Sequence, residues 1–359
     1  MKRLGFFILL FAAALTASAQ IRIATPNTEM VLSAEQGKTL KIQYFGARLS
    51  DADLANLQAA GVPDHNAYQP YGFNCASEPA FAATHCDGNM STVLTVESIS
   101  KAEEPTAEVT RIRLKDTVYP LYVTVCYRAY KDVDMIETWT EIENLEKKPV
   151  TLTRFDSGYL PVRVGDVWLS HLHGTWAAEG RLVQEPLDRG MRVIKNKDGS
   201  RNSHTDHAEV MFSLDGKPQE NAGRVIGAAL CYSGNYELRI DTKDTDYHEF
   251  FAGINPDNSA YILASKEVFK TPELALTYSD EGLSGASRNF HRWGRKYKLA
   301  HGDKERKILL NSWEGVYFDI NEPGMDQMMG DIASMGGELF VMDDGWFGNK
   351  YARTDSQGL

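Results

Sequence analysis

The sequence FVMDDGWFG, residues 340–348, joins a short apolar run to two adjacent acids, a glycine and a tryptophan. The apolar residues are typical of a buried strand, and Asp343 and Asp344 stand where that strand would end. Two adjacent carboxylates repel each other, so the chain needs a physical reason to place them together. A ligand that binds both carboxylates would supply such a reason.

The residues before this stretch predict a strand, a helix and a second strand. KILLNSW (307–313) and ELFVMDD (338–344) are strand-like, and the residues between them carry Pro323 near the start and two glycines at the end, as helices do. A strand–helix–strand unit of this length makes its strands parallel. Because chemistry in such folds lies at the carboxyl ends of the strands, we expect Trp313 and the two acids on one face.

From about residue 20 to 280 the sequence predicts many short strands. LYVTVCYRAY (121–130) has apolar residues at every odd position through 125, and DMIETWTEIEN (134–144) also alternates. Turn residues separate such runs at short intervals, with few helical patterns between them. This pattern is typical of a large antiparallel β-sandwich.

The pattern changes near residue 280. SDEGLSGASRNFHRWGRKYK (279–298) predicts an amphipathic helix, because its apolar residues are three and four positions apart. We therefore expect four segments, which are a signal peptide at 1–19, a β-sandwich domain at 20–280, a helical connector at 281–305 and the start of a catalytic barrel at 306–359.

Composition and the N-terminus limit the classes of partner and the compartment. The net charge of −11 argues against nucleic acid and against anionic membrane surfaces as partners. MKRLGFFILLFAAALTASAQ (1–20) has a basic start, an apolar run too short to span a bilayer, and small residues at 17–19. We expect cleavage after Ala19 and export to the periplasm or the extracellular space.

The chain has four cysteines, Cys75, Cys86, Cys126 and Cys231. Export would permit disulfides. Their spacing matches no zinc pattern, and Cys75 and Cys86 are the pair nearest in sequence. Buried free thiols explain the four residues equally well, so their pairing stays open.

Each candidate site residue could serve the structure or bind a ligand. Asp343 and Asp344 fit a turn followed by a helix cap, but two acids and an aromatic at the end of a strand favour a ligand. Ionised carboxylates are strong acceptors for sugar hydroxyls. Because a glycosidase needs two carboxyls on opposite sides of the scissile bond, an adjacent pair is better suited to holding substrate. Core packing or a stacking platform for a pyranose both explain Trp176, Trp313 and Trp346.

His171 and His173 alternate on one predicted strand face, which makes a metal site conceivable. No third ligand stands nearby in the sequence, so we predict no metal.

Two stretches resemble the α-galactosidases of glycoside hydrolase family 36. LLNSWEGVYFDINE (309–322) and GELFVMDDGWFGN (337–349) are similar to the first two barrel strands of that family, and 271–293 is similar to the segment that joins its sandwich to its barrel. The resemblance implies a multidomain β plus α/β fold. An N-terminal β-supersandwich would be followed by the first β-α-β unit of a (β/α)8 TIM barrel, which is incomplete here because such a barrel needs about 200 residues or more.

The resemblance also assigns residues to a galactose pocket. Both acids of the family's DDGW motif bind hydroxyls of the terminal galactose, and these match Asp343 and Asp344. The tryptophan that borders the pocket matches Trp313, and a tryptophan of the sandwich matches Trp176 in GTW (174–176), although the AAEGR that follows departs from the family pattern. The family also places an N-terminal acid at the site, for which Asp64 and Asp87 are candidates.

The family's nucleophile lies in a Lys-Trp-Asp motif, and neither this motif nor the matching acid/base occurs in the sequence. We therefore expect the N-terminal part of a retaining α-galactosidase that acts on oligosaccharides without a cofactor, with no catalytic residue in this chain. A homo-oligomer is compatible with the resemblance. An α-N-acetylgalactosaminidase of the same architecture, or a non-catalytic carbohydrate-binding or structural module, are the alternatives.

Overall fold

The computed structural model of the chain describes residues 19–60, 65–72 and 77–346. The chain divides into two compact units, residues 1–294 and residues 295–359. The expected signal peptide, Cys75 and Asp64 lie outside the described residues. Within the described part, no helix has the length and apolar character that a membrane crossing requires.

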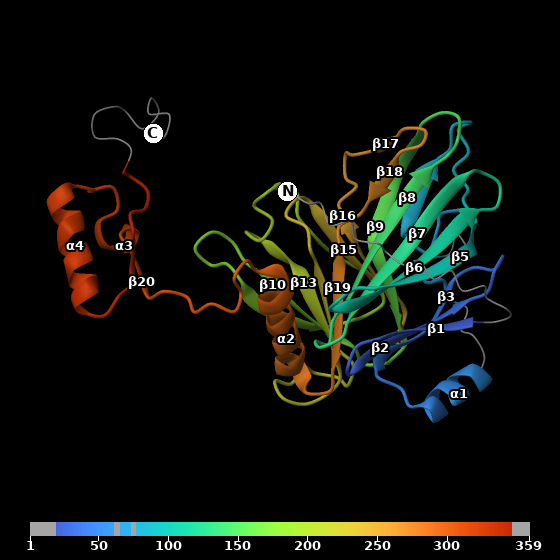
Figure 1. The fold of residues 1–359 in the computed structure, drawn as a ribbon, viewed down its shortest axis with the longest axis horizontal. Helices are drawn as coiled ribbons and strands as arrows, with labels where there is room; N and C mark the ends of the chain where they lie inside the picture. The colour runs from blue at the N-terminus through green and yellow to red at the C-terminus, as the bar shows by residue number, and fades with distance from the viewer. Residues whose placement is uncertain (1–18, 61–64, 73–76, 347–359) are drawn as a thin grey trace, which may run out of the picture. The chain divides into compact units, whose positions relative to one another are not determined.

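The first unit is built from antiparallel sheets, which confirms the predicted sandwich (Figure 1). In the largest sheet of the described residues the order is β11-β10-β13-β14-β19-β8-β7-β6-β5, and β18 also pairs with β8. Its strands are β5 (Leu94–Glu103), β6 (Ala107–Asp116), β7 (Leu121–Tyr130), β8 (Ile136–Asn144), β10 (Trp168–His173), β11 (Arg181–Pro186), β13 (Asp206–Ser213), β14 (Val225–Leu230), β18 (Val268–Lys270) and β19 (Leu274–Ser279).

The second sheet faces the first across a common apolar core. Its order is β12-β15-β16-β9-β17, and β4 also pairs with β9. The strands are β4 (Phe81–Thr84), β9 (Val150–Val162), β12 (Gly190–Lys195), β15 (Tyr236–Asp244), β16 (Tyr247–Ile254) and β17 (Tyr261–Leu263). Both sheets contribute buried side chains to one cluster, as the alternating sequence requires.

Strand β7 shows how the alternation works. Leu121, Val123 and Val125 are almost completely buried in the common core, as their odd positions predict. On the opposite face Cys126 packs with Trp139 in a separate small cluster, and burial raises the pKa of the Cys126 thiol to about 12. This strand is therefore covered on both faces along part of its length.

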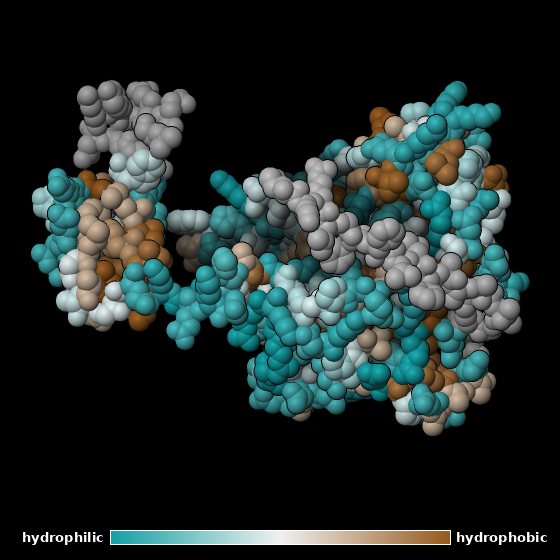
Figure 2. Space-filling model, viewed as in Figure 1, coloured by the Kyte–Doolittle hydropathy of each residue, from teal (hydrophilic) through white to brown (hydrophobic). Residues whose placement is uncertain are grey.

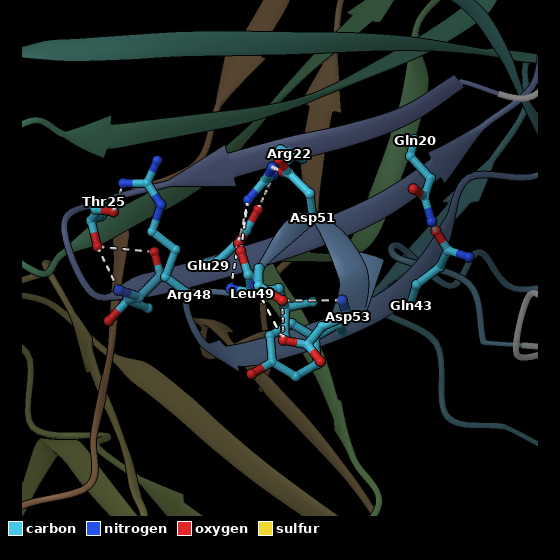
Figure 3. A network of polar contacts seen from close by, with 12 residues as sticks. Gln20, Arg22, Thr25, Glu29, Gln43, Arg48, Leu49, Asp51 and Asp53 are labelled. Carbon is cyan, nitrogen blue, oxygen red and sulfur yellow. Dashed lines mark hydrogen bonds and ion pairs between the residues drawn. The ribbon is translucent and has the colours of Figure 1, made fainter. Parts of the chain in front are cut away.

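A third sheet at the N-terminus contains β1 (Ala19–Ala24), β2 (Thr28–Ala34) and β3 (Lys41–Ala47). The buried Glu29 carboxylate on β2 accepts hydrogen bonds from the guanidinium of Arg22 and, at 2.9 Å, from the Leu49 backbone N–H (Figure 3). A charge buried with these donors is compensated, so Glu29 fixes the path of the chain that leaves β3.

That path leads into α1 (Asp51–Ala59), a helix that the sequence did not predict. Ser50 and Asp53 form a capping box at its start, in which each side chain accepts a hydrogen bond from the other's backbone N–H. None of its residues is buried, so it has no apolar stripe. Hydrophobic periodicity therefore contains no sign of α1.

Helix α2 (Gly282–Trp293) confirms the predicted amphipathic helix and packs on β19, β14 and β13 of the largest sheet (Figure 1). The π-helical turn Gly294–Lys298 follows it. The second unit then contains β20 (Leu309–Asn311), α3 (Trp313–Val316), α4 (Glu322–Ser334) and β21 (Leu339–Val341). β20 and β21 are parallel, which confirms the predicted strand–helix–strand unit.

Candidate functional site

The two acids follow β21 after one residue, Met342, at the edge of the second unit where β20 also ends. The parallel register pairs Asn311 with Val341, so the residues after each strand meet at that edge. The Asp343 backbone N–H donates to Ser312 Oγ at 3.0 Å, and Ser312 is fully buried. The sequence prediction that the strand ends share one face holds for these residues.

The Asp343 carboxylate is held by two donors. Asn311 Nδ2 donates to Asp343 Oδ2 at 2.6 Å, and the Asp344 backbone N–H donates to Asp343 Oδ1 at 2.6 Å. These hydrogen bonds, that of Asn311 first, lower the pKa of Asp343 below its ordinary value. Asp343 is therefore ionised at neutral pH, and each of its oxygens keeps capacity for a further hydrogen bond from a ligand.

Asp344 takes part in the turn that follows. Its Oδ1 accepts from the Gly345 backbone N–H at 3.0 Å. Gly345 has φ 101°, and a Cβ at this position would lie 3.1 Å from the Cα of Phe318. Both facts favour glycine. The chain thus turns immediately after the acids, and the carboxyl groups of both remain partly exposed.

Trp313 does not end the first strand, as the sequence analysis expected, but begins α3. The Asn311 side chain accepts a hydrogen bond from the Trp313 backbone N–H at 2.8 Å, which takes this residue out of the sheet ladder. The indole lies edge-on to the rings of Tyr317 and Phe318, with centroid distances of 5.3 and 4.9 Å. It is half-buried, so part of the ring stays accessible.

The structure therefore brings Asn311, Ser312, Trp313 and the two acids together. Asn311 and Ser312 were not recognised as site residues from the sequence. Trp346 is the last described residue of this unit, and its side chain is 48% exposed. The assignment of Asp343, Asp344, Trp313 and Trp346 to a substrate remains a prediction.

The other candidates belong to the first unit. Trp176 lies in the loop between β10 and β11 and is 78% exposed. Asp87 accepts hydrogen bonds from the Asn89 backbone N–H at 3.0 Å and from Tyr119 Oη at 2.8 Å, which lower its pKa. Asp87 is thus held by its own loop and by Tyr119 from the loop between β6 and β7, and its role at a site stays a prediction.

His171 and His173 both lie on β10, as predicted. His171 is buried, whereas His173 is exposed and its Nδ1 lies 2.7 Å from Asp206 Oδ1. Across the described ranges, no three His, Cys, Asp or Glu side chains gather in a way that could hold a metal ion. Cys86 and Cys126 carry free thiols in the described part of the chain.

Two protein-family models match consecutive parts of the sequence. The Glycosyl hydrolase family 36 N-terminal domain matches residues 38–264, and Melibiase matches residues 268–359. The chain belongs to glycosyl hydrolase family 36. The first segment covers most of the sandwich unit, and the second contains α2 and both acids of the family 36 chain.

Relatives of this family 36 chain include α-galactosidases. It is 34% identical over 250 residues to alpha-galactosidase AgaA of Geobacillus stearothermophilus, a match that covers 69% of this chain and 34% of the relative. It is 31% identical over 258 residues to alpha-galactosidase Mel36A of Lactobacillus acidophilus, with 71% and 35% covered.

Solved structures of family 36 α-galactosidases resemble the chain. The structure of AgaA has a TM-score of 0.82 at 27% identity, with 92% of this chain and 50% of that chain covered. Structures of AgaA variants in complex with raffinose and with stachyose each have a TM-score of 0.83. The chain thus spans about a third of the length of its curated relatives and about half of these solved chains.

Proposed function

We propose that the complete gene product hydrolyses terminal, non-reducing α-D-galactosyl residues of oligosaccharides. The relatives that carry this proposal are α-galactosidases, and variants of one of them have been solved with raffinose and stachyose bound. In the chain itself, the supporting observation is the pair of acids just after β21, at the carboxyl end of two parallel strands, where such folds place their ligands.

Within this activity the chain would hold the sugar. Asp343 and Asp344 would accept hydrogen bonds from galactose hydroxyls, and Asn311 would keep the Asp343 carboxylate ionised and oriented. Trp313 and Trp346 offer partly exposed rings on which the apolar face of a pyranose can stack. Trp176, in the loop between β10 and β11 of the first unit, offers another exposed ring on which a sugar can stack.

The chemical step is assigned to other residues. The carboxyl groups of a retaining glycosidase lie about 5–5.5 Å apart on either side of the scissile bond, a geometry that two adjacent residues on one strand end do not supply. The Lys-Trp-Asp motif of the family is absent from these 359 residues. The proposal therefore places no nucleophile and no acid/base in this chain.

Two activity measurements test the proposal. The complete gene product should hydrolyse a chromogenic α-galactoside with retention and prefer it to the 2-acetamido analogue. Residues 20–359 alone should show no turnover above the solvent background. A preference for the 2-acetamido substrate would instead indicate an α-N-acetylgalactosaminidase. Carbohydrate binding by the complete product without hydrolysis would indicate a binding module.

We also propose export and self-association. The basic start, the apolar run and the small residues of 1–19 support removal of a signal peptide. N-terminal sequencing of the secreted protein should begin at Gln20, and a blocked or unprocessed Met1 would contradict export by this route. The proposal of a homo-oligomer rests on the family resemblance alone. Sedimentation velocity of the complete product would show whether it forms one.

A further inference from the structure

The loop between β10 and β11, residues 174–180, presents Trp176 to solvent. Its side chain is 78% exposed, the highest exposed fraction among the large apolar side chains of the described residues. A single exposed apolar side chain is common on protein surfaces and indicates nothing by itself. The contacts that hold the loop around Trp176 are more informative than its exposure.

The base of the loop is fixed to the segment that precedes β13. The Gly174 backbone N–H donates to the Thr205 carbonyl at 2.7 Å, and His173 Nδ1 lies 2.7 Å from Asp206 Oδ1. A Cβ on Gly174 would lie 2.4 Å from the Ala178 carbonyl oxygen. The loop therefore folds back on its own first residue, and only glycine fits there.

The tip of the loop holds an unfavourable backbone conformation. The Ala178 backbone N–H donates to the Thr175 carbonyl at 2.8 Å, which closes a turn around Trp176 and Ala177. Ala177 has φ 59°, in the left-handed region that residues with a Cβ rarely adopt. Such a conformation persists only where its surroundings impose it. Some group must therefore stabilise the residue next to Trp176.

That group is the Glu179 carboxylate. The Ala177 backbone N–H donates to Glu179 Oε1 at 2.9 Å. His204 Nε2 lies 3.6 Å from the same oxygen. Backbone amides, that of Glu179 itself first and that of Ala177 next, lower the pKa of Glu179, so the carboxylate is ionised at neutral pH. A charged acceptor thus binds the amide of the strained residue.

We propose that Glu179 is a positioning residue for Trp176. By binding the Ala177 amide it fixes the turn in one conformation, so that the exposed indole is already oriented when a sugar arrives. This inference rests on the proposed function, in which Trp176 stacks on the carbohydrate. A side chain ordered before binding loses less conformational entropy on complex formation, so the effect falls on affinity and not on the chemical step.

Variants of the complete gene product test the proposal. Glu179→Ala should raise KM for an α-galactoside about threefold to tenfold, the range of a lost carboxylate-to-amide cap, and change kcat less than about twofold. Glu179→Gln should recover part of the loss, because its amide oxygen can still accept from Ala177. In the same proteins, hydrogen exchange at the Ala177 amide should be faster for Glu179→Ala. Glu35→Ala, at an exposed turn between β2 and β3, is the matched control and should change neither quantity.

The double variant separates positioning from a general loss of stability. If Glu179 acts through Trp176, the variant Trp176→Ala/Glu179→Ala should have the KM of Trp176→Ala alone. A further rise in KM in the double variant, or unchanged exchange at Ala177 in Glu179→Ala, would overturn the proposal. An unchanged KM in Trp176→Ala would instead remove Trp176 from the proposed sugar contact, whatever the exchange at Ala177 shows.

Discussion

At the scale of single residues, the structure explains how two adjacent carboxylates are accommodated. Asp343 receives hydrogen bonds from the Asn311 side chain and the Asp344 backbone, and Asp344 receives one from the Gly345 backbone. These donors offset part of the mutual repulsion. The turn interpretation and the ligand interpretation are therefore compatible, and kinetics must decide whether the pair also binds substrate.

We expect Asp343→Asn and Asp344→Asn to lower kcat/KM of the complete gene product while the fold stays intact. Asparagine keeps the shape of the side chain but replaces one acceptor oxygen by a donor and removes the charge. A hydrogen bond to a charged group contributes roughly 1.5–3 kcal/mol, so the loss should be about tenfold to a hundredfold. Steady-state kinetics and the melting temperature should be measured on one preparation. Unchanged kinetics with lowered stability would mean that the acids serve only the turn.

Asn311 supplies a second test at the same site, through pH. The pKa of Asp343 is lowered, first by the Asn311 side chain. The bound state that needs ionised Asp343 is therefore present above this lowered pKa and is lost as the pH falls through it. Asn311→Ala removes the donor, so the pKa of Asp343 should rise and the acid limb of the KM profile should move to higher pH. If the acid limb of the KM profile stays at the same pH in Asn311→Ala, ionisation of Asp343 does not control substrate binding.

The site was only partly predictable from the sequence at this scale. The acids were recognised because they interrupt an apolar run at its end. Asn311 and Ser312 were missed as partners of Asp343, because their contacts depend on the register that pairs Asn311 with Val341. Register between strands distant in sequence leaves no local pattern. Asp64, the other acid suggested by the resemblance, lies outside the described residues.

At the scale of elements, polar contacts as well as apolar packing attach α2 to the largest sheet. Its spacing predicted the helix, but polar side chains also fasten it to the sheet. Trp293 Nε1 donates to Oε1 of the fully buried Glu137 at 3.1 Å, and Asn289 Nδ2 donates to Thr277 Oγ1 at 2.9 Å. Glu137 also accepts from Arg128 at 2.7 Å. The same glutamate thus joins α2 to two strands.

We expect Trp293→Phe to destabilise the first unit. Phenylalanine retains an aromatic ring but removes the donor to a buried carboxylate, and losing a hydrogen bond to a charged group costs about 1.5–3 kcal/mol. For a unit of this size the melting temperature should fall by about 3–12 °C. Calorimetry should be compared with Phe290→Leu, which changes an apolar side chain of the same helix without removing a donor. If the melting temperature of Trp293→Phe falls no further than that of Phe290→Leu, the hydrogen bond to Glu137 does not stabilise the unit as argued.

Regular elements were predictable where packing imposes a period, and others were not. The alternation of β7 and the stripe of α2 reflect burial on one face. Helix α1 has no buried face, and its evidence in the sequence is limited to the capping pair Ser50 and Asp53. Trp313 was placed in a strand because it closely follows the apolar residues 308–310, whereas in the structure the Asn311 side chain accepts a hydrogen bond from its backbone N–H and Trp313 begins α3.

At the scale of the whole molecule, the two units differ in how completely they cover their apolar side chains. The first unit has a large core shared by two sheets. In the second, β20 pairs with β21 in a two-stranded sheet, which is marginally stable alone. Its large exposed apolar side chains are Leu299, Ile308, Leu309, Tyr317, Phe318, Met329, Met335, Leu339, Met342 and Trp346. Figure 2 colours hydrophobic residues brown.

This difference predicts the behaviour of the expressed chain. Residues 20–359 should self-associate at concentrations where residues 20–294 remain monomeric, because exposed apolar patches and unpaired strand edges favour association. Sedimentation velocity of both proteins over a concentration series measures this directly. A charged substitution in the second unit, Leu339→Lys, should reduce the association, whereas Leu182→Lys, at an exposed leucine of the first unit, should not. If 20–359 stays monomeric, its apolar residues must be covered within the chain itself, and the strand edges of β20 and β21 would not be available for pairing.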